Sequence, residues 1–292
     1  MTKLPVILLN YNSSADCRKC VCDLKRQQGV ELEIIIVDNC SRKEEADAIK
    51  KLAEENQCTY IPATENRGYN AGNNIGLRYA ATKGYEYALI ANPDMLFPET
   101  NYISRLFSEI RHHSDIAIAA SDITSPQVSH QNPMIPDPES WTSGFAWIKT
   151  IMPCPNKKTD SNIGDYKTTH FCKKVSGCCF LVSMNFVKDI DFFDENVFLY
   201  CEEAILSKLV EKHNKKILYL ADICAVHNHI KATKGNARKH FKAWISSRLY
   251  FERKYNYQNP HSHFLKIIGW KSYLIMFCLK DYFRNIITAT YK

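Results

Sequence analysis

The stretch ELEIIIVD, residues 31 to 38, is an apolar run that ends in a carboxylate. Similar runs recur through residues 1–120, and segments with helical character separate them. These runs are PVILLN (5–10), CTYIPA (58–63), YALIAN (87–92) and IAIAA (116–120). Strands that alternate with helices pair in parallel through right-handed crossovers, and near-continuous apolar strands are typical of a sheet covered on both faces. The sequence therefore predicts an α/β domain.

The intervening segments predict helices at residues 14–28, 43–56, 70–83 and 99–112, with Gly84 as a natural C-terminal stop. The alternation ends near residue 122. Residues 122–170 are rich in Pro, Ser, Asn and Asp and predict a long irregular segment, which in compact domains is usually a lid or binding loop. After it we expect the strand KVSGCCFLVS (174–183), a helix from about residue 202 and the strand KILYLA (216–221).

The composition is that of a globular protein: 292 residues, 45% hydrophobic, 24% charged, with a mean hydropathy of −0.32. No run approaches the roughly 20 apolar residues of a membrane span, and the N-terminal apolar run is too short for a signal peptide. We therefore expect a cytoplasmic location. The 12 cysteines include one CxxC pair, Cys17 and Cys20, without a second ligand pair, so we interpret them as small hydrophobes rather than a zinc site or disulfide framework.

The positive charge is concentrated at the C-terminus. Residues 231–292 hold 13 Lys or Arg against two acids, a local charge of +11 within a net charge of +7. A basic segment can meet phosphates of nucleic acid, of lipid headgroups or of a diphosphate substrate, or it can form a solvated face.

The stretch LIANPDMLF, residues 89–97, interrupts an apolar run with Asn92-Pro93-Asp94. This is common turn chemistry. However, ligands of open α/β sheets bind at the carboxyl ends of strands, where both Asp38 and Asp94 would lie. The loop ENRGYNAGNNIG (65–76) spaces glycines by four residues, but neither a GxGxxG strand–helix motif nor a P-loop is present.

Two further segments carry chemically useful side chains. FDENVFLYCEEAIL (193–206) contains Glu202 and Glu203, which either complement a helix dipole or supply a general base. ADICAVHNHIKAT (221–233) brings His227 and His229 after a strand, where one of them could join an aspartate and phosphate oxygens around a hard metal ion.

Taken in order, LLNYN, IIIVDNCS, ENRGYNAGNNIG, ANPD, KVSGCCFLVS, FFDENVFLYCEEAIL and ADICAVHNHIKAT resemble glycosyltransferase family 2. The resemblance spans residues 4 to about 255 and is to bacterial rhamnosyltransferase-like enzymes that build surface polysaccharides. It implies a GT-A fold, with a mixed, mostly parallel sheet flanked by helices. Residues 1–120 would form the nucleotide-binding half and 121–230 the acceptor-binding half of a catalytic domain, and 231–292 a helical extension.

The resemblance also implies the roles of individual residues. Asp94, with Asn92 in place of a first acid, would bind Mg²⁺ or Mn²⁺ together with His227, and His229 is the less favoured alternate. The donor nucleotide sugar would be bound by Asn12, Asp38, Asn66, Gly68, Gly72, Asn74, Asn92, Asp94 and Gly177. Asp38 would contact the base.

In the family, the catalytic base is the aspartate of a Glu-Asp pair, whereas this chain has Glu202-Glu203. Glu203 occupies the base position. Its extra methylene moves the carboxylate by about 1.5 Å, and a misplacement of about 1 Å can cost about 100-fold in rate. Either the acceptor lies differently, or Glu202 contributes more, or activity is weak.

The implied activity is inverting transfer of a sugar from dTDP-rhamnose or a UDP-sugar to a hydroxyl of a glycan or lipid-linked glycan. Residues 122–170 would shape the acceptor site. HFLKIIGWKSYLIMFCLKDYFRNII (263–287) suits a peripheral amphipathic helix at a membrane, or helices packed on the protein or in a homodimer. The rival interpretations are a sugar nucleotidyltransferase, a non-catalytic relative and a nucleic-acid-binding protein; for the last, the tail has no recognised motif, so we expect no nucleic-acid partner.

Overall fold

The computed structural model describes residues 3–127, 129–148, 163–229, 237–257 and 259–290, without the side chains at 141, 237 and 281–290. The chain divides into two compact units. The first comprises Met1–Pro136, Ser161–Phe198 and Glu202–Thr233, and the second Asp137–Asp160, Leu199–Cys201 and Lys234–Lys292. Each unit is considered by itself.

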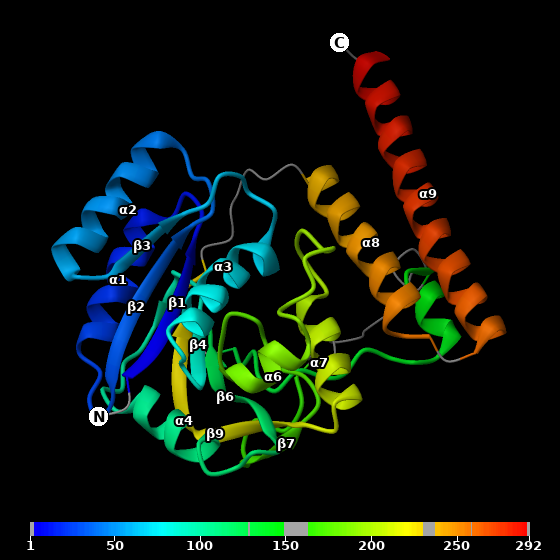
Figure 1. The fold of residues 1–292 in the computed structure, drawn as a ribbon. Helices are drawn as coiled ribbons and strands as arrows, with labels where there is room; N and C mark the ends of the chain where they lie inside the picture. Colours follow the sequence, from blue (N-terminus) through cyan, green and yellow to red (C-terminus); the bar gives the residue numbers. More distant parts are fainter. Residues whose placement is uncertain (1–2, 128, 149–162, 230–236, 258, 291–292) are drawn as a thin grey trace. The chain divides into compact units, whose positions relative to one another are not determined.

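The first unit is built on one twisted, mixed sheet (Figure 1). Its strands in the described residues are β1 (Lys3–Asn10), β2 (Glu31–Asp38), β3 (Thr59–Pro62), β4 (Tyr87–Ala91), β5 (Met95–Leu96), β6 (Ile116–Thr124), β7 (His170–Cys172), β8 (Cys179–Ser183) and β9 (Lys216–His227). The order is β3-β2-β1-β4-β8-β6-β9-β5, and β7 pairs with β9 off this path. The strands β3, β2, β1 and β4 are parallel neighbours, as are β6 and β9.

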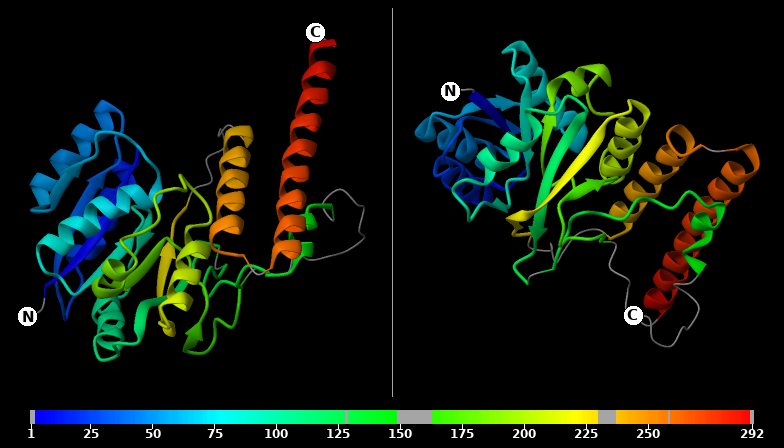
Figure 2. Two further views of the ribbon diagram at one scale, coloured as in Figure 1. Left: turned by 45° about the vertical axis from the view of Figure 1, so that its right-hand side comes forward. Right: turned by 90° about the horizontal axis from the view of Figure 1, so that it is seen from below.

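Helices cover both faces of this sheet, as the apolar strands predicted (Figure 2). The helices of the first unit are α1 (Ser14–Lys25), α2 (Lys43–Asn56), α3 (Tyr69–Thr82), α4 (Tyr102–Ile110), α6 (Met184–Asp189) and α7 (Glu202–Lys212). Alternate residues of each strand enter opposite cores: Ile36 packs with α1, α2 and α4, whereas Ile35 packs with α3, α6 and α7. The predicted mixed, mostly parallel α/β sheet with flanking helices is confirmed.

Cysteine serves as core material, as expected. Cys17 and Cys20 on α1 and Cys179 on β8 are fully buried in the same core. Burial raises the pKa of the Cys17 thiol to about 12, because it disfavours the thiolate. The cysteines in the described residues are free thiols.

The antiparallel insertion of β8 was not apparent from the sequence. β8 pairs antiparallel with β4 on one side and β6 on the other, so it joins the two parallel groups of the sheet. Local periodicity carries no information on strand direction, and the short elements β5, β7 and α6 were also not predicted. β6 and β9 shift register at Ser121/Asp122, after which β9 continues to His227.

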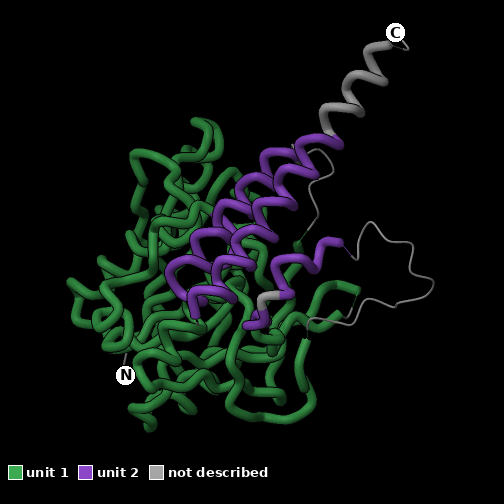
Figure 3. Tube along the Cα trace, turned by 90° about the vertical axis from the view of Figure 1, so that its right-hand side faces the viewer, with its two compact units in different colours: residues 1–136, 161–198, 202–233 green, residues 137–160, 199–201, 234–292 purple. Residues whose placement is uncertain are grey.

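The second unit contains two long helices, α8 (Ala237–Lys254) and α9 (Pro260–Thr290), and the 3₁₀ helix η1 (Trp141–Phe145) (Figure 3). The expected C-terminal helices are therefore present. η1 packs closely on α9, since a Cβ added to Gly144 would lie 2.5 Å from the carbonyl oxygen of Lys266. Over the described residues, no helix has the length and apolar character needed to cross a membrane.

A buried charge network joins α8 to α9. Glu252 on α8 is fully buried and forms ion pairs with Arg248, whose Nη2 lies 2.7 Å from Oε1, and with Lys266 of α9, whose Nζ lies 3.3 Å from Oε2. Arg248 also pairs with Asp137. Asn256 donates to Glu252 Oε2 at 2.8 Å. Because buried charges are costly unless paired, this network holds the two helices in one register.

We predict that Glu252→Leu destabilises the second unit by about 3–5 kcal/mol, because it leaves the Lys266 ammonium buried without its carboxylate. Glu252→Leu combined with Lys266→Met should recover much of that loss, since the uncompensated charge is then removed as well. Urea unfolding followed by tryptophan fluorescence measures this, because all four tryptophans lie in the second unit. Equal destabilisation of the single and double variants would contradict the coupling.

Candidate functional site

The Asn92-Pro93-Asp94 turn lies at the end of β4, and strand pairing holds it in place. The Asn92 N–H donates to the Cys178 carbonyl at 2.8 Å, and the Asn228 N–H donates to the Asp94 carbonyl at 2.9 Å. Immediately after the turn, β5 pairs antiparallel with β9, which sets Met95 opposite His227. A carboxylate from one strand end thus meets imidazoles from another.

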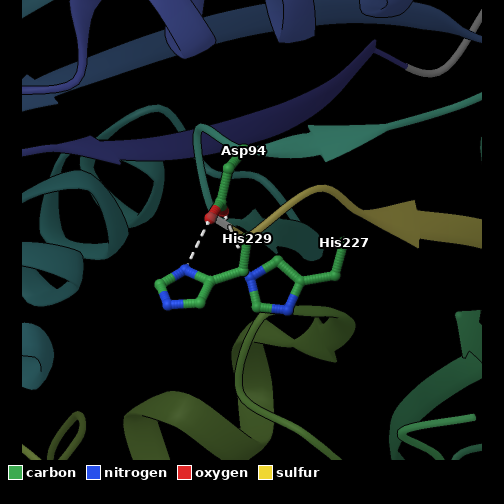
Figure 4. Close-up of side chains that lie close together, drawn as sticks. All are labelled: Asp94, His227 and His229. Carbon is green, nitrogen blue, oxygen red and sulfur yellow. Dashed lines mark hydrogen bonds and ion pairs between the residues drawn. The ribbon is translucent and has the colours of Figure 1, made fainter. Parts of the chain in front are cut away.

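Asp94, His227 and His229 form a candidate metal site (Figure 4). His227 Nε2 lies 3.2 Å from Asp94 Oδ1, and His229 Nδ1 lies 3.2 Å from Asp94 Oδ2. The potential ligand atoms all lie within 4.8 Å of one another. Asp94 Oδ1 and His227 Nε2 are buried, and neither makes a hydrogen bond of acceptable geometry. Two buried ligand atoms without hydrogen-bond partners fit a divalent cation, for which carboxylate and imidazole are suitable ligands.

The electrostatics of this pair favour charge on both partners. Burial alone would lower the pKa of His227, but the adjacent Asp94, with Cys178, raises it to about 10. Burial alone would raise the pKa of Asp94, but His227 and then His229 hold it below its usual value. The pair therefore favours a protonated His227 beside an ionised Asp94, and a cation at Nε2 would have to displace that proton.

Gln131 orients His227, a role that the sequence analysis missed. Its side-chain carbonyl oxygen Oε1 lies 2.9 Å from His227 Nδ1, and with Nδ1 as the donor, Nε2 is directed toward Asp94. The neighbouring His130 is fixed by Asp122, with Nδ1 3.0 Å from each carboxylate oxygen, and stacks on Tyr166 at 3.7 Å. No local sequence signal marks Gln131, because its partner lies in a distant strand.

The turn at Ser176–Cys178 connects the candidate metal site to the predicted catalytic base, Glu203. Cys178 accepts from Asn92 through its carbonyl, while the N–H of Gly177 donates to Glu203 Oε1 at 3.3 Å. A Cβ at residue 177 would lie 3.3 Å from that oxygen, so glycine leaves room for the longer glutamate side chain. Gly177 and Glu203, both predicted site residues, are in direct contact.

The surroundings of Glu203 are largely apolar. Glu202 and Glu203 begin α7 and line a pocket with Tyr69, Asn70, Asp194 and Gly177. The remaining lining is hydrophobic: Val175, Phe180, Phe193, Ile205, Leu206 and Leu209. The Tyr69 hydroxyl donates to the Gly177 carbonyl. Burial first, then the thiol of Cys178 and the two glutamates, raise the pKa of Tyr69 well above its usual value, so it keeps its proton.

Asp38 lies at the end of β2 opposite Asn10 of β1, and the protein's own donors hold its carboxylate. Asp38 is 2% exposed and accepts from Asn10 Nδ2 at 2.9 Å and from the Ser41 N–H at 3.2 Å. Asn12 joins the same network, donating through its N–H to Ser41 Oγ at 2.9 Å and accepting from the Arg42 N–H. The predicted contact of Asp38 with the base stays a prediction.

Four more residues predicted to bind the donor nucleotide sugar lie in the glycine-rich loop and in α3. Asn66 Oδ1 accepts from the Gly68 N–H at 3.0 Å and from Asn39 at 3.2 Å. Gly72 approaches β1, where an added Cβ would lie 2.4 Å from Leu9. Asn74 is fully buried and exchanges hydrogen bonds with the backbone of Phe193. Asn74 therefore fastens α3 to the segment before α7, and its predicted donor contact is untested.

Other side chains at this edge were not singled out from the sequence. Arg67 and Arg78 both pair with Glu195, at 3.2 and 2.9 Å, beside a second pocket that Gly72 also lines. Tyr11 is 51% exposed between Asn10 and Asn12. An exposed aromatic ring beside a polar strand end could have been noted, since such rings often stack on ligands.

Similarity to known proteins gives the family of this chain. The glycosyl transferase family 2 profile matches residues 6–185, more than half of the chain. The chain therefore belongs to glycosyl transferase family 2.

One curated relative and two solved structures are also similar to this chain. Agl10 of Haloferax volcanii, a low-salt glycan biosynthesis hexosyltransferase, is 26% identical over 226 residues, which are 77% of this chain and 67% of the relative. PcManGT, a mannosyltransferase from Pyrobaculum calidifontis solved with GDP-Man and Mn²⁺, is 14% identical with a TM-score of 0.56, covering 93% of this chain and 69% of that one. GalNAc-T7 with UDP, GalNAc and Mn²⁺ is 12% identical with a TM-score of 0.61, covering 89% and 52%. The two structures support the GT-A fold.

Gly68 provides a test of how rigidly this loop is held. Gly68 has φ +102°, and an added Cβ would lie 2.2 Å from the Phe198 carbonyl oxygen. Gly84, with φ +74°, has open space around it. We predict that Gly84→Ala costs about 1 kcal/mol through backbone strain, and that Gly68→Ala costs clearly more, because backbone must also move.

Thermal unfolding followed by far-UV circular dichroism compares the two alanine variants. If they lower the unfolding temperature equally, the close approach at Phe198 is not a rigid constraint.

Proposed function

We propose that this chain is an inverting, metal-dependent glycosyltransferase that moves a sugar from a nucleoside-diphosphate donor to a hydroxyl of a glycan acceptor. The observation that carries the proposal is the juxtaposition of two groups. Asp94 and His227 lie 3.2 Å apart, and the Asn92 N–H of the Asp94 turn donates to the Cys178 carbonyl, while Glu203 accepts from the N–H of the adjacent Gly177. A leaving diphosphate and an attacking hydroxyl need these two groups on opposite sides of a sugar.

In this mechanism, Glu203 takes the proton of the acceptor hydroxyl while the Gly177 N–H orients its carboxylate. Attack from the face opposite the nucleotide inverts the anomeric centre. Asp94 and His227 would hold Mg²⁺ or Mn²⁺, which would neutralise the negative charge that grows on the departing diphosphate. The apolar lining around Glu203 limits the access of water to the base.

The donor would lie along the carboxyl ends of β1, β2 and β4, where the predicted donor residues gather. Residues 1–120 would thus serve the nucleotide and 121–230 the acceptor. The exposed ring of Tyr11 is suited to stack on the base. PcManGT was solved with GDP-Man and Mn²⁺, and GalNAc-T7 with UDP and Mn²⁺, which supports a nucleotide-sugar donor with a divalent cation.

We propose dTDP-rhamnose or a UDP-sugar as the donor, and a glycan of the cell surface, free or linked to lipid, as the acceptor. The similarity to a hexosyltransferase of glycan biosynthesis supports this class of acceptor. Glu203 in place of a shorter aspartate leaves the acceptor oxygen slightly farther from the backbone of α7.

The test is release of nucleoside diphosphate from a panel of nucleotide sugars, with and without Mn²⁺ and with glycan acceptors. We expect Glu203→Gln to lower kcat by about 100-fold or more at unchanged donor affinity, since the amide keeps the Gly177 contact but cannot take a proton. Glu202→Gln is the matched control and should lose much less. Asp94→Ala should abolish the metal dependence together with turnover.

Several outcomes would overturn this scheme. A wild-type rate in Glu203→Gln would remove Glu203 as the base. Release of pyrophosphate instead of a nucleoside diphosphate would indicate a sugar nucleotidyltransferase. Donor binding without any turnover by the wild type would indicate a non-catalytic relative.

A separate prediction concerns Gln131. Gln131→Met removes the acceptor for His227 Nδ1 at similar size, so we expect Mn²⁺ affinity to fall by about 10–100-fold. Gln131→Glu keeps an acceptor oxygen and should hold Mn²⁺ at least as well as the wild type. Titration followed by the electron paramagnetic resonance of free Mn²⁺ measures both without any donor. Wild-type affinity in Gln131→Met would show that the contact does not position the imidazole.

A further inference from the structure

The outward face of α9 is apolar where a surface helix is normally polar. Phe264, Ile268, Ile275 and Leu279 are 63, 40, 60 and 52% exposed. Their spacings of four and seven residues place them on one side of the helix, and Lys271 lies on the same side. We call these five residues the outward stripe of α9.

The inward face of α9 shows the opposite distribution. Lys266 is 1% exposed and pairs with the fully buried Glu252 of α8. Trp270 is buried and its ring meets Trp244 of α8 at 5.4 Å. The second unit therefore completes its own packing with a different face of α9. The outward stripe does not take part in this packing. Scattered exposed apolar residues are ordinary, whereas four of them gathered on one side of a helix mark a candidate interaction site.

The charges that accompany the stripe are positive. Glu252 is the only acid on α8, and it is buried and paired. Exposed cations on the two helices include Arg253, Lys271 and Lys280. The described side chains of α9 include no acid. Over the described side chains, the accessible charge of the two helices is thus cationic, and Lys271 lies within the apolar stripe itself.

We propose that the outward stripe of α9 docks on an anionic lipid surface. Apolar side chains enter the boundary between headgroups and acyl chains, while neighbouring cations meet lipid phosphates. The helix lies on such a surface rather than across it, since the described helices have no membrane-spanning segment. A second copy of the chain fits less well, because it would place the Lys271 ammonium groups of both copies in the same interface.

This proposal goes beyond sugar transfer, and it also offers a reason for a lipid-linked acceptor. A glycan attached to lipid is presented at the membrane surface, so an enzyme held there meets it at high local concentration. The contact depends on charge and should therefore weaken with salt.

The experiment is sedimentation of the whole protein with vesicles of phosphatidylcholine alone or of equal parts phosphatidylcholine and phosphatidylglycerol. We expect binding to the anionic vesicles, little to the neutral ones, and loss of binding as salt is raised. The double variant Phe264→Ser with Ile275→Ser should bind the anionic vesicles about tenfold more weakly or worse. Phe171→Ser, which removes an equally exposed ring from β7 of the first unit, should bind as the wild type does.

Controls separate folding and self-association from lipid binding. The substituted residues are exposed, so unfolding monitored by tryptophan fluorescence should be unchanged. Wild-type binding by the double variant, or no binding of the wild type to anionic vesicles, overturns the proposal. If light scattering shows a wild-type dimer and the same two substitutions make it monomeric, the stripe would be assigned to contact with a second copy. Donor turnover without vesicles should be equal in all these variants, so the outcome does not depend on the transferase assay.

Discussion

The site depends on the pairing of a two-residue strand. With two residues, β5 would contribute little stability as a separate strand. Its pairing with β9 places it at the edge of the sheet and sets Met95 opposite His227. The Asp94 carboxylate therefore faces two imidazoles while backbone hydrogen bonds fix the turn on both sides. An exposed aspartate in a free loop would lose conformational entropy on binding a cation, and here that loss has already occurred on folding.

The Ser176–Cys178 turn links the Asp94 turn to Glu203 and Tyr69. Its Cys178 carbonyl holds the Asn92 turn, its Gly177 N–H holds Glu203, and its Gly177 carbonyl receives the Tyr69 hydroxyl. The turn leads directly into β8, which is buried between β4 and β6. In the proposed mechanism, the groups that act on the leaving diphosphate and on the attacking hydroxyl must keep a fixed separation, and a turn anchored in the middle of the sheet would provide one.

The second unit distributes its residues in a different way from the first. In the sheet domain, apolar strand residues fill two cores and polar groups lie at strand ends. In α8 and α9, a carboxylate and an ammonium are buried while Phe264 and Ile275 face outward. Buried ion pairs contribute little net stability, but they specify which faces of two helices meet. The result is a defined helix pair whose free face differs chemically from the surface of the sheet domain.

The sequence by itself determined most of the helices and strands and the types of side chain at the candidate site. Apolar runs such as ELEIIIVD predict buried strands, because periodicity and residue type are local properties, and the resemblance of the ordered motifs to a known family pointed to Asp94, Glu203 and His227. Only the tertiary structure decided that β8 runs antiparallel, that His229 also reaches Asp94, that Gln131 orients His227, and that Lys266 is inside while Phe264 is outside. All of these are contacts between segments that are distant in the sequence. Their geometry depends on how whole helices and strands pack, so no local sequence pattern encodes them.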